Sequence, residues 1–263
     1  MSAALELRDL AKAFAEVRAL DGITLALAPG EFVTVIGSNG AGKSSLLKAI
    51  TGHLTPDRGT ILLNGADITR APIHRRATRI SRIAQDPQES SCASMTIAEN
   101  LAMAALRGHP RGLGRAVTPQ RRTRFRDLLA ETGLGLQDRL DTRMATLSGG
   151  QRQAVALLMA TIANPGVLLL DEHLAALDPR AAALVMALTA ARVTQDRLTT
   201  LMITHDMQAA ITWGSRLIMM HAGRIVLDVS GTEKAALTIP GLVERFHAVS
   251  GTILADDRAL LTP

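Results

Sequence analysis

The chain has 263 residues, 47% of them hydrophobic and only 2% aromatic, and its 29 Lys and Arg against 24 Asp and Glu give a formal net charge of +5. This apolar content is enough for a buried core and excludes a disordered or collagen-like chain. A single cysteine, Cys92, excludes an internal disulfide. The longest apolar run is about half of a bilayer-spanning helix, so we expect a soluble intracellular protein.

The positive charge is concentrated in two stretches, five arginines from Arg70 to Arg82 and seven from Arg107 to Arg126, and neither contains an acidic residue. Such a stretch is typical of a solvated helix face, or of a surface that meets nucleic acid, anionic lipid or an acidic partner. The scarcity of aromatic side chains removes the base-stacking platforms of single-strand binders. Charge alone leaves these alternatives open.

The first third of the chain predicts strands with a glycine-rich loop among them. Leu5 to Leu10 and Ile23 to Leu27 predict short strands, and Glu31 to Ile36 is a β-branched apolar run typical of a buried strand. The glycine-rich loop follows, and Lys43 to Thr51 has helical character. Asn64-Gly65, between Ile61-Leu62-Leu63 and Ala66-Asp67-Ile68, predicts a tight hairpin.

The rest of the chain predicts a helical insertion and then alternating strands and helices. The pattern is helical from about Thr96 to Thr146, with Gly and Pro breaks at 108–114. Such alternation predicts an α/β fold with a largely parallel sheet covered by helices. The later strands are expected at Val167 to Leu170, Thr199 to Ile203 and Arg216 to Met220, and the helices begin at Pro179 and Asp206.

The loop between the Glu31 strand and the Lys43 helix matches the phosphate-binding pattern G-x-x-x-x-G-K-[ST]. Its glycines let successive N–H groups face the phosphates, and the helix adds its positive end. Lys43 would reach the β- and γ-phosphates, and Ser44 would bind Mg²⁺. The predicted nucleotide-binding residues of this loop are Gly37, Ser38, Asn39, Gly40, Ala41, Gly42, Lys43, Ser44 and Ser45.

Two acidic residues follow the apolar run from Val167 to Leu170. Open α/β sheets bind ligands at the carboxyl ends of their strands, so this position suits a magnesium nucleotide. Asp171 would bind Mg²⁺, directly or through water, and Glu172 would orient or deprotonate the attacking water. An ordinary strand end with two solvated acids is the alternative.

A second anion cradle is predicted where Leu147, Ser148, Gly149, Gly150 and Gln151 precede an apolar helical run. A serine and two glycines at a helix start offer a hydroxyl, N–H groups and the helix dipole to the same ligand. In most proteins this pattern is only a helix cap. The chain has one lysine-bearing loop, so both cradles could share one nucleotide only if they came from different subunits.

These motifs, in this order, resemble the nucleotide-binding subunit of ATP-binding cassette (ABC) transporters over nearly the whole chain. The resemblance implies roles for Gln85 as an Mg²⁺ contact and link to membrane subunits, Asp178 in the D-loop, and His205 as the switch at the γ-phosphate. Phe14 would place its ring against adenine. Taken singly, each has a plain alternative: an exposed Gln, a helix cap, a satisfied His and a core Phe.

The resemblance implies a P-loop NTPase core with a mostly parallel sheet, an N-terminal antiparallel β subdomain and a helical insertion. We expect one ABC ATPase domain over residues 1–263. About 1–95 and 147–249 form the catalytic core with the β subdomain, about 96–146 the helical subdomain, and 250–263 a C-terminal tail.

The resemblance also implies ATP and Mg²⁺ as cofactors, a homodimer that sandwiches two ATP molecules, and a peripheral place at the cytoplasmic face of the inner membrane. The partners would be integral-membrane permease subunits, docking around Gln85 and the segment from Asp86 to Ala105, and an extracytoplasmic substrate-binding protein; no nucleic acid is expected. The alternative is a soluble cassette ATPase that acts on nucleic acid or another assembly, and only the basic stretches favour it.

A finer resemblance is to a bacterial importer group, partly uncharacterised, that includes tryptophan and tyrosine uptake. The sequence departs from the common D-E-P-[TS] form, with His173 in place of Pro and Leu174 in place of Thr. His173 could make a packing or D-loop contact, which we favour, or act as an extra acid–base group. Trp213 and four methionines, Met202, Met207, Met219 and Met220, are expected in the core.

Overall fold

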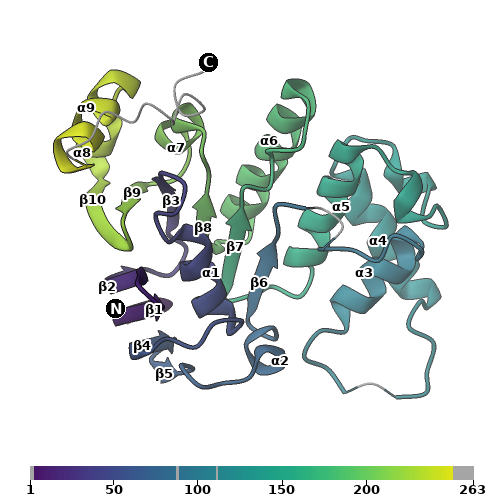
Figure 1. Ribbon diagram of the computed structural model, residues 1–263. Helices are drawn as coiled ribbons and strands as arrows, with labels where there is room; N and C mark the ends of the chain where they lie inside the picture. The colour runs from purple at the N-terminus through teal and green to yellow at the C-terminus, as the bar shows by residue number, and fades with distance from the viewer. Residues whose placement is uncertain (1–2, 87–88, 111, 251–263) are drawn as a thin grey trace. The chain divides into compact units, whose positions relative to one another are not determined.

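The computed structural model describes residues 3–86, 89–110 and 112–250 (Figure 1). These residues form two compact units. Unit 1 takes the described parts of residues 1–76 and 197–263, and unit 2 takes those of residues 77–196. The predicted C-terminal tail lies outside the described residues, apart from Ser250 at the end of the last helix.

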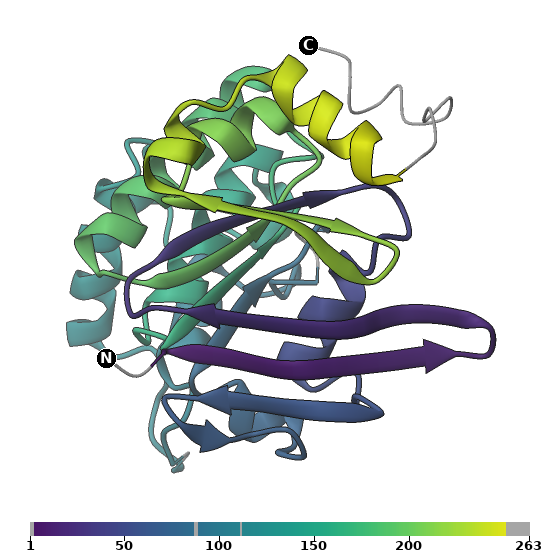
Figure 2. The same ribbon diagram turned by 90° about the vertical axis from the view of Figure 1, so that its left-hand side faces the viewer.

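Unit 1 contains a four-stranded antiparallel sheet in the order β2-β1-β4-β5, whose first two strands form the long hairpin in Figure 2. Leu5, Leu7 and Leu10 of β1 are buried. Both hairpin strands are longer than predicted, because their pairing continues to Phe14 and Val17 through residues of mixed polarity. The strands are β1 (Leu5–Phe14), β2 (Val17–Leu27), β4 (Arg58–Leu63) and β5 (Ala66–Asp67).

The other strands of unit 1 surround β3 (Phe32–Gly37), which pairs in parallel with β8 (Thr199–Ile203) and with β9 (Arg216–His221). The last strand, β10 (Arg224–Ser230), is antiparallel to β9. The carboxyl ends of β3 and β8 therefore lie at the same edge. The helices of this unit are α1 (Lys43–Thr51), α2 (Ile73–Arg76), α7 (Met207–Thr212), α8 (Gly231–Ala235) and α9 (Ile239–Ser250).

A buried cluster in unit 1 joins Ile36 of β3 and Met219 of β9 to side chains of α7 and α9. All four methionines that were expected in the core are buried, which confirms that prediction. Trp213 is only partly buried, because it lies just beyond the end of α7. The ammonium of the buried Lys234 donates to the carbonyls of Ile211, Trp213 and Gly214, and this fixes the end of α7 against α8.

Unit 2 pairs β6 (Ile80–Ile83) in parallel with β7 (Val167–Asp171), and the chain between them is helical. A buried cluster around Phe125 and Leu129 joins three of these helices, and a capping box of Thr96 and Glu99 begins the first of them. The elements are α3 (Ile97–Ala105), α4 (Pro119–Ala130), the 3₁₀ turns η1 (Leu136–Asp138) and η2 (Met144–Thr146), α5 (Gly149–Thr161) and, after β7, α6 (Pro179–Gln195).

The predicted fold class is confirmed: an antiparallel β sheet near the N-terminus, mostly parallel strands elsewhere, and a helical segment between β6 and β7. The boundaries proposed for the subdomains remain predictions. Within the described part of the chain, no helix combines the length and apolarity needed to cross a membrane.

Candidate functional site

The phosphate-binding loop of unit 1 connects the end of β3 to the start of α1, as the sequence predicts. Gly42 precedes the helix in the left-handed conformation, with φ of 98°, and no side chain among the described residues caps the first turn. Asn39, Gly40 and Ser44 are exposed, whereas Ala41 is buried. The loop therefore presents helix N–H groups and a hydroxyl on its open side, an arrangement that suits a phosphate.

Lys43 is buried, and its side chain folds back over the loop that precedes it. Its ammonium donates to the carbonyl oxygens of Gly37 at 2.5 Å and Ser38 at 2.9 Å. These charge-assisted bonds hold the lysine within the loop, next to the helix N-terminus.

Two glycines of the loop lie where no side chain fits. A Cβ on Gly37 would come within 2.2 Å of the Met220 carbonyl oxygen, and one on Gly42 within 2.3 Å of the Ala19 carbonyl oxygen. A Cβ on Gly40, by contrast, would meet no described atom within 4 Å. Close backbone approach thus requires glycine at positions 37 and 42. At position 40, glycine is favoured only by the positive φ of 77°.

His205 and Phe14 also belong to unit 1. His205 is exposed two residues beyond β8, and the N–H of Thr204 donates to the carbonyl of Val35 in β3, so the histidine follows the same sheet edge as the phosphate-binding loop. Phe14 ends β1 with 52% of its surface exposed, and the Lys12 ammonium lies 5.6 Å from its ring centre. The core alternative for Phe14 is therefore wrong, and the adenine contact remains a prediction.

Unit 2 holds the two predicted acids at the end of β7. Asp171 is buried, and its Oδ2 accepts a hydrogen bond from Arg82 Nη2 at 2.7 Å. Glu172 has a positive φ of 45°, a left-handed conformation that strains a residue other than glycine. His173 is buried, its Nε2 has no hydrogen-bond partner among the described atoms, and burial lowers the pKa of its imidazole from 6.5 to about 4.

The predicted second cradle forms the start of α5. Ser148 Oγ accepts from the Gln151 N–H, and Gln151 Oε1 accepts from the Ser148 N–H, so the two residues make a capping box. Ser148 and Gly149 are exposed, while Leu147 anchors the segment in the helical core. The helix-cap alternative is thus realised in this structure, and the exposed backbone stays compatible with an anion.

Asp178 and Gln85 lie in two other loops of unit 2. Asp178 caps α6, since its Oδ1 accepts from the Ala181 N–H at 3.0 Å. Gly149 and Gly150 face this segment closely: added Cβ atoms would lie 3.2 Å from Leu177 Cδ2 and 3.0 Å from Ala181 Cβ. Gln85 is exposed just after β6. The phosphate-binding loop, His205 and Phe14 thus belong to unit 1, and the other predicted residues belong to unit 2.

The predicted magnesium ligands fit the chemistry of that ion. Ser44, Gln85 and Asp171 offer hydroxyl, amide and carboxylate oxygens, the hard donors that Mg²⁺ prefers. No cluster of three or more His, Cys, Asp or Glu occurs within the ranges that the structure describes. One carboxylate is what we expect of a magnesium site completed by nucleotide phosphates and water.

The sequence analysis missed the residue that binds Asp171. Arg82 lies in the first basic stretch, which we interpreted as a surface feature, yet it sits within the strand β6 and its side chain is only 25% exposed. Arg107 of the second stretch donates to Ser81 on the same strand, and burial lowers the pKa of its guanidinium. An arginine in the middle of an apolar strand was the available signal.

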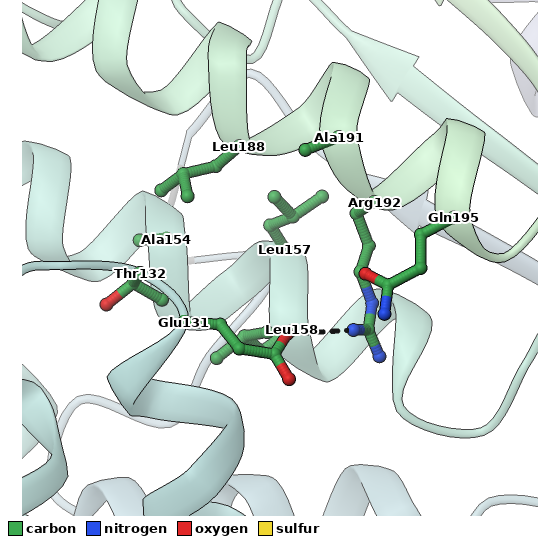
Figure 3. A pocket seen from close by; sticks show the side chains of 9 residues that line it. All are labelled: Glu131, Thr132, Ala154, Leu157, Leu158, Leu188, Ala191, Arg192 and Gln195. Atoms are coloured by element: carbon green, nitrogen blue, oxygen red, sulfur yellow. Dashed lines mark hydrogen bonds and ion pairs between the residues drawn. The ribbon is translucent and has the colours of Figure 1, made fainter.

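A cavity of about 460 Å³ lies at the end of α4 against α5 and α6, and it contains none of the predicted residues (Figure 3). Leu157, Leu158 and Leu188 give it an apolar lining. At its rim the Arg192 guanidinium donates to Glu131 at 3.2 Å. The lining offers no group suited to phosphate chemistry other than this paired arginine.

Comparison with known proteins places these features in a family. Residues 20–175 match the family described as ABC transporter. A tyrosine transport ATP-binding protein of Clostridioides difficile is 40% identical over 92% of this chain and 98% of that protein. The phosphonates import ATP-binding protein PhnC of Frankia casuarinae is 34% identical over 86% of this chain and 89% of that protein. A dimeric ATP-binding cassette bound to ADP and Pi superposes with a TM-score of 0.73 at 25% identity, covering 86% of this chain and 98% of the other.

The crowding around Gly42 predicts a sharp difference between two glycine substitutions. Gly42→Ala forces the loop away from Ala19, whereas Gly40→Ala adds only the strain of a positive φ. We expect Gly42→Ala to weaken equilibrium ATP binding at least about tenfold, which corresponds to roughly 1.4 kcal/mol, and Gly40→Ala to change it less than about threefold. Equal affinities in the two variants would contradict the steric argument.

Burial of His173 predicts that acid destabilises the protein. The unfolded chain binds a proton near pH 6.5 and the folded chain only near pH 4, so the free energy of unfolding falls as the pH drops through that window. Between pH 7 and pH 5 the wild type should lose about 2 kcal/mol more than His173→Asn in urea unfolding. His74→Asn, at an exposed position, is the control. Parallel pH profiles for wild type and His173→Asn would refute the assignment.

Proposed function

The chain belongs to the ABC transporter family and is an ATP hydrolase, and on this premise we propose that it drives import of a small solute through separate membrane permease subunits. The observation that carries the proposal is the similarity to the tyrosine transport protein, which spans 98% of that relative. The phosphonates import relative supports the direction of transport. The solute is a small molecule such as an amino acid, chosen by the membrane and binding-protein subunits.

The phosphate-binding loop and the residues at the ends of β7 and β8 take different roles in ATP binding and hydrolysis. The N–H groups of the loop and the Lys43 ammonium hold the phosphates of ATP, and His205 contacts the γ-phosphate. Glu172 orients the attacking water and accepts its proton. Ser44, Asp171 and Gln85 would hold Mg²⁺, which would neutralise phosphate charge. Phe14 covers the adenine.

The second cradle serves the nucleotide of another copy. Ser148 and Gly149 are exposed at the positive end of α5, and the same chain already holds a complete lysine-bearing loop. Two copies related by a twofold axis would form two ATP sites, each with the lysine-bearing loop of one copy and the Ser148 cradle of the other. The dimeric cassette with ADP and Pi supports this homodimer. Leu177 and Ala181, on either side of Asp178, lie next to the glycines of the second cradle, in keeping with a D-loop at the same interface.

The membrane partners follow from the same proposal. The permease subunits dock around Gln85 and the described part of residues 86–105, within or next to a helical subdomain of about 96–146. The ATPase is then a peripheral protein on the cytoplasmic face of the inner membrane, and an extracytoplasmic protein delivers the solute.

The nucleic-acid alternative loses its support in the structure. Three arginines of the basic stretches are engaged inside the protein: Arg76 with carbonyls at the end of α1, Arg82 with Asp171, and Arg107 with Ser81. Importer subunits among the relatives favour the transport function instead.

Replacement of the proposed catalytic carboxylate tests the hydrolytic assignment. Glu172→Gln keeps the shape of the side chain but cannot accept a proton, so ATP should still bind while phosphate release slows by at least about 100-fold. With ATP bound and not hydrolysed, the dimer should persist and elute at twice the monomer mass. Turnover like that of the wild type would sink the role of Glu172.

Stimulation of turnover distinguishes a transport ATPase from one that acts on nucleic acid. We expect the permease subunits of the transporter, reconstituted in lipid vesicles, to raise the ATPase rate severalfold, as a coupled partner should. Double-stranded DNA and single-stranded RNA at matched ionic strength are the comparison. Stimulation by either nucleic acid and none by the permease would reverse the proposal.

A further inference from the structure

The carboxylate proposed for Mg²⁺ already has a cation bound to it. In the parallel pairing of β6 with β7, Arg82 lies opposite Leu169. Side chains alternate along a strand, so Arg82 shares its face of the sheet with Leu169 and with Asp171, two residues further on. The Arg82 Nη2 lies 2.7 Å from Asp171 Oδ2, a charge-assisted hydrogen bond.

This ion pair is largely withdrawn from water. The side chain of Asp171 is 10% exposed and that of Arg82 is 25% exposed. A charge pair in such surroundings is weakly screened, and loss of one partner leaves the other charge poorly compensated. Arg82 therefore acts as the resident counter-cation of Asp171, unlike the surface pairs of the same unit.

Because Arg82 binds the Asp171 carboxylate, it would compete with a divalent cation for that carboxylate. Mg²⁺ and a guanidinium on one carboxylate repel each other, and each withdraws electron density that the other would use. A carboxylate has two oxygens, so Mg²⁺ can bind while Arg82 stays close, but at reduced affinity.

We propose that Arg82 competes with Mg²⁺ for Asp171 and thereby weakens the divalent-cation affinity of the nucleotide-loaded subunit. The proposal rests on the proposed function, which makes Asp171 a ligand of that ion. Arg82 is thus a positioning residue, which sets how much Mg²⁺ is needed before the site is complete. It does not take part in hydrolysis itself.

The test measures metal binding and not turnover. Mn²⁺, followed by the electron paramagnetic resonance signal of the free ion, is titrated into the full-length protein saturated with ADP. Arg82→Met removes the charge and keeps an unbranched apolar side chain like the stem of arginine, and it should tighten Mn²⁺ binding about tenfold. Arg82→Lys keeps the charge and should stay near the wild type. Unchanged or weaker Mn²⁺ binding by Arg82→Met would overturn the proposal.

Two further variants make the outcome specific. Arg122→Met removes an arginine from an exposed pair, Arg122 with Asp141 at 2.7 Å, and should leave Mn²⁺ affinity unchanged. If Arg82→Met does not fold, Arg82→Gln takes its place. Its amide can still donate a hydrogen bond, and because it carries no charge we again expect tighter Mn²⁺ binding.

Asp171→Asn separates failure of this inference from failure of the proposed function. It should weaken Mn²⁺ binding. If it does so while Arg82→Met changes nothing, only the competition is wrong. If Asp171→Asn leaves Mn²⁺ affinity intact, Asp171 is not a metal ligand, and the metal assignment of the proposed function falls together with the inference.

Discussion

The backbone around the phosphate-binding loop is packed so closely that two of its residues can have no side chain, and the rest of unit 1 is arranged around this contact. The carbonyl oxygens that exclude a Cβ at Gly37 and Gly42 belong to β9 and β2. The turn after β9 adds a hydrogen bond from the Gly223 N–H to the carbonyl of Ala41. Strands from both sheets of the unit therefore fix the loop before any phosphate arrives, so the donors need little reorganisation on binding.

Local patterns allowed the loops and caps of the site to be predicted from the sequence. The glycine-rich loop, the Ser148 cap and the Asp178 cap each depend on residues within a few positions of one another, so their geometry is encoded where it is used. The lengths of β1 and β2 were not predictable in this way. Their outer parts, Ala11–Phe14 and Val17–Gly22, mix polar and apolar residues without a regular alternation and are held by pairing across the hairpin, with an irregularity at Asp9, where φ is 49°.

The arginines mark the limit of prediction from sequence. Each alternative considered for the basic stretches placed them at a surface, because arginine is rarely buried without a partner. Arg76 instead donates to the carbonyls of Ala49 and Ile50 at the end of α1, and Arg82 reaches Asp171, 89 residues away in sequence. Contacts of this range depend on how strands and helices pack, which spacing along the chain does not record. The net charge therefore says little about partners, because some of the arginines that contribute to it bind groups within the protein.

Three consecutive residues, the last of β7 and the two that follow it, are each constrained differently, and this bears on the unusual histidine. Asp171 is held by its ion pair with Arg82, and His173 is held by burial. Glu172, between them, adopts a left-handed backbone conformation that costs about 1–3 kcal/mol. Such strain persists only where the surroundings over-determine the conformation. A proline at position 173, common in the family that the chain resembles, would restrict the backbone directly. The buried imidazole does so by packing, and with a pKa of about 4 it is uncharged near neutral pH. The packing interpretation of His173 is therefore favoured over an acid–base role.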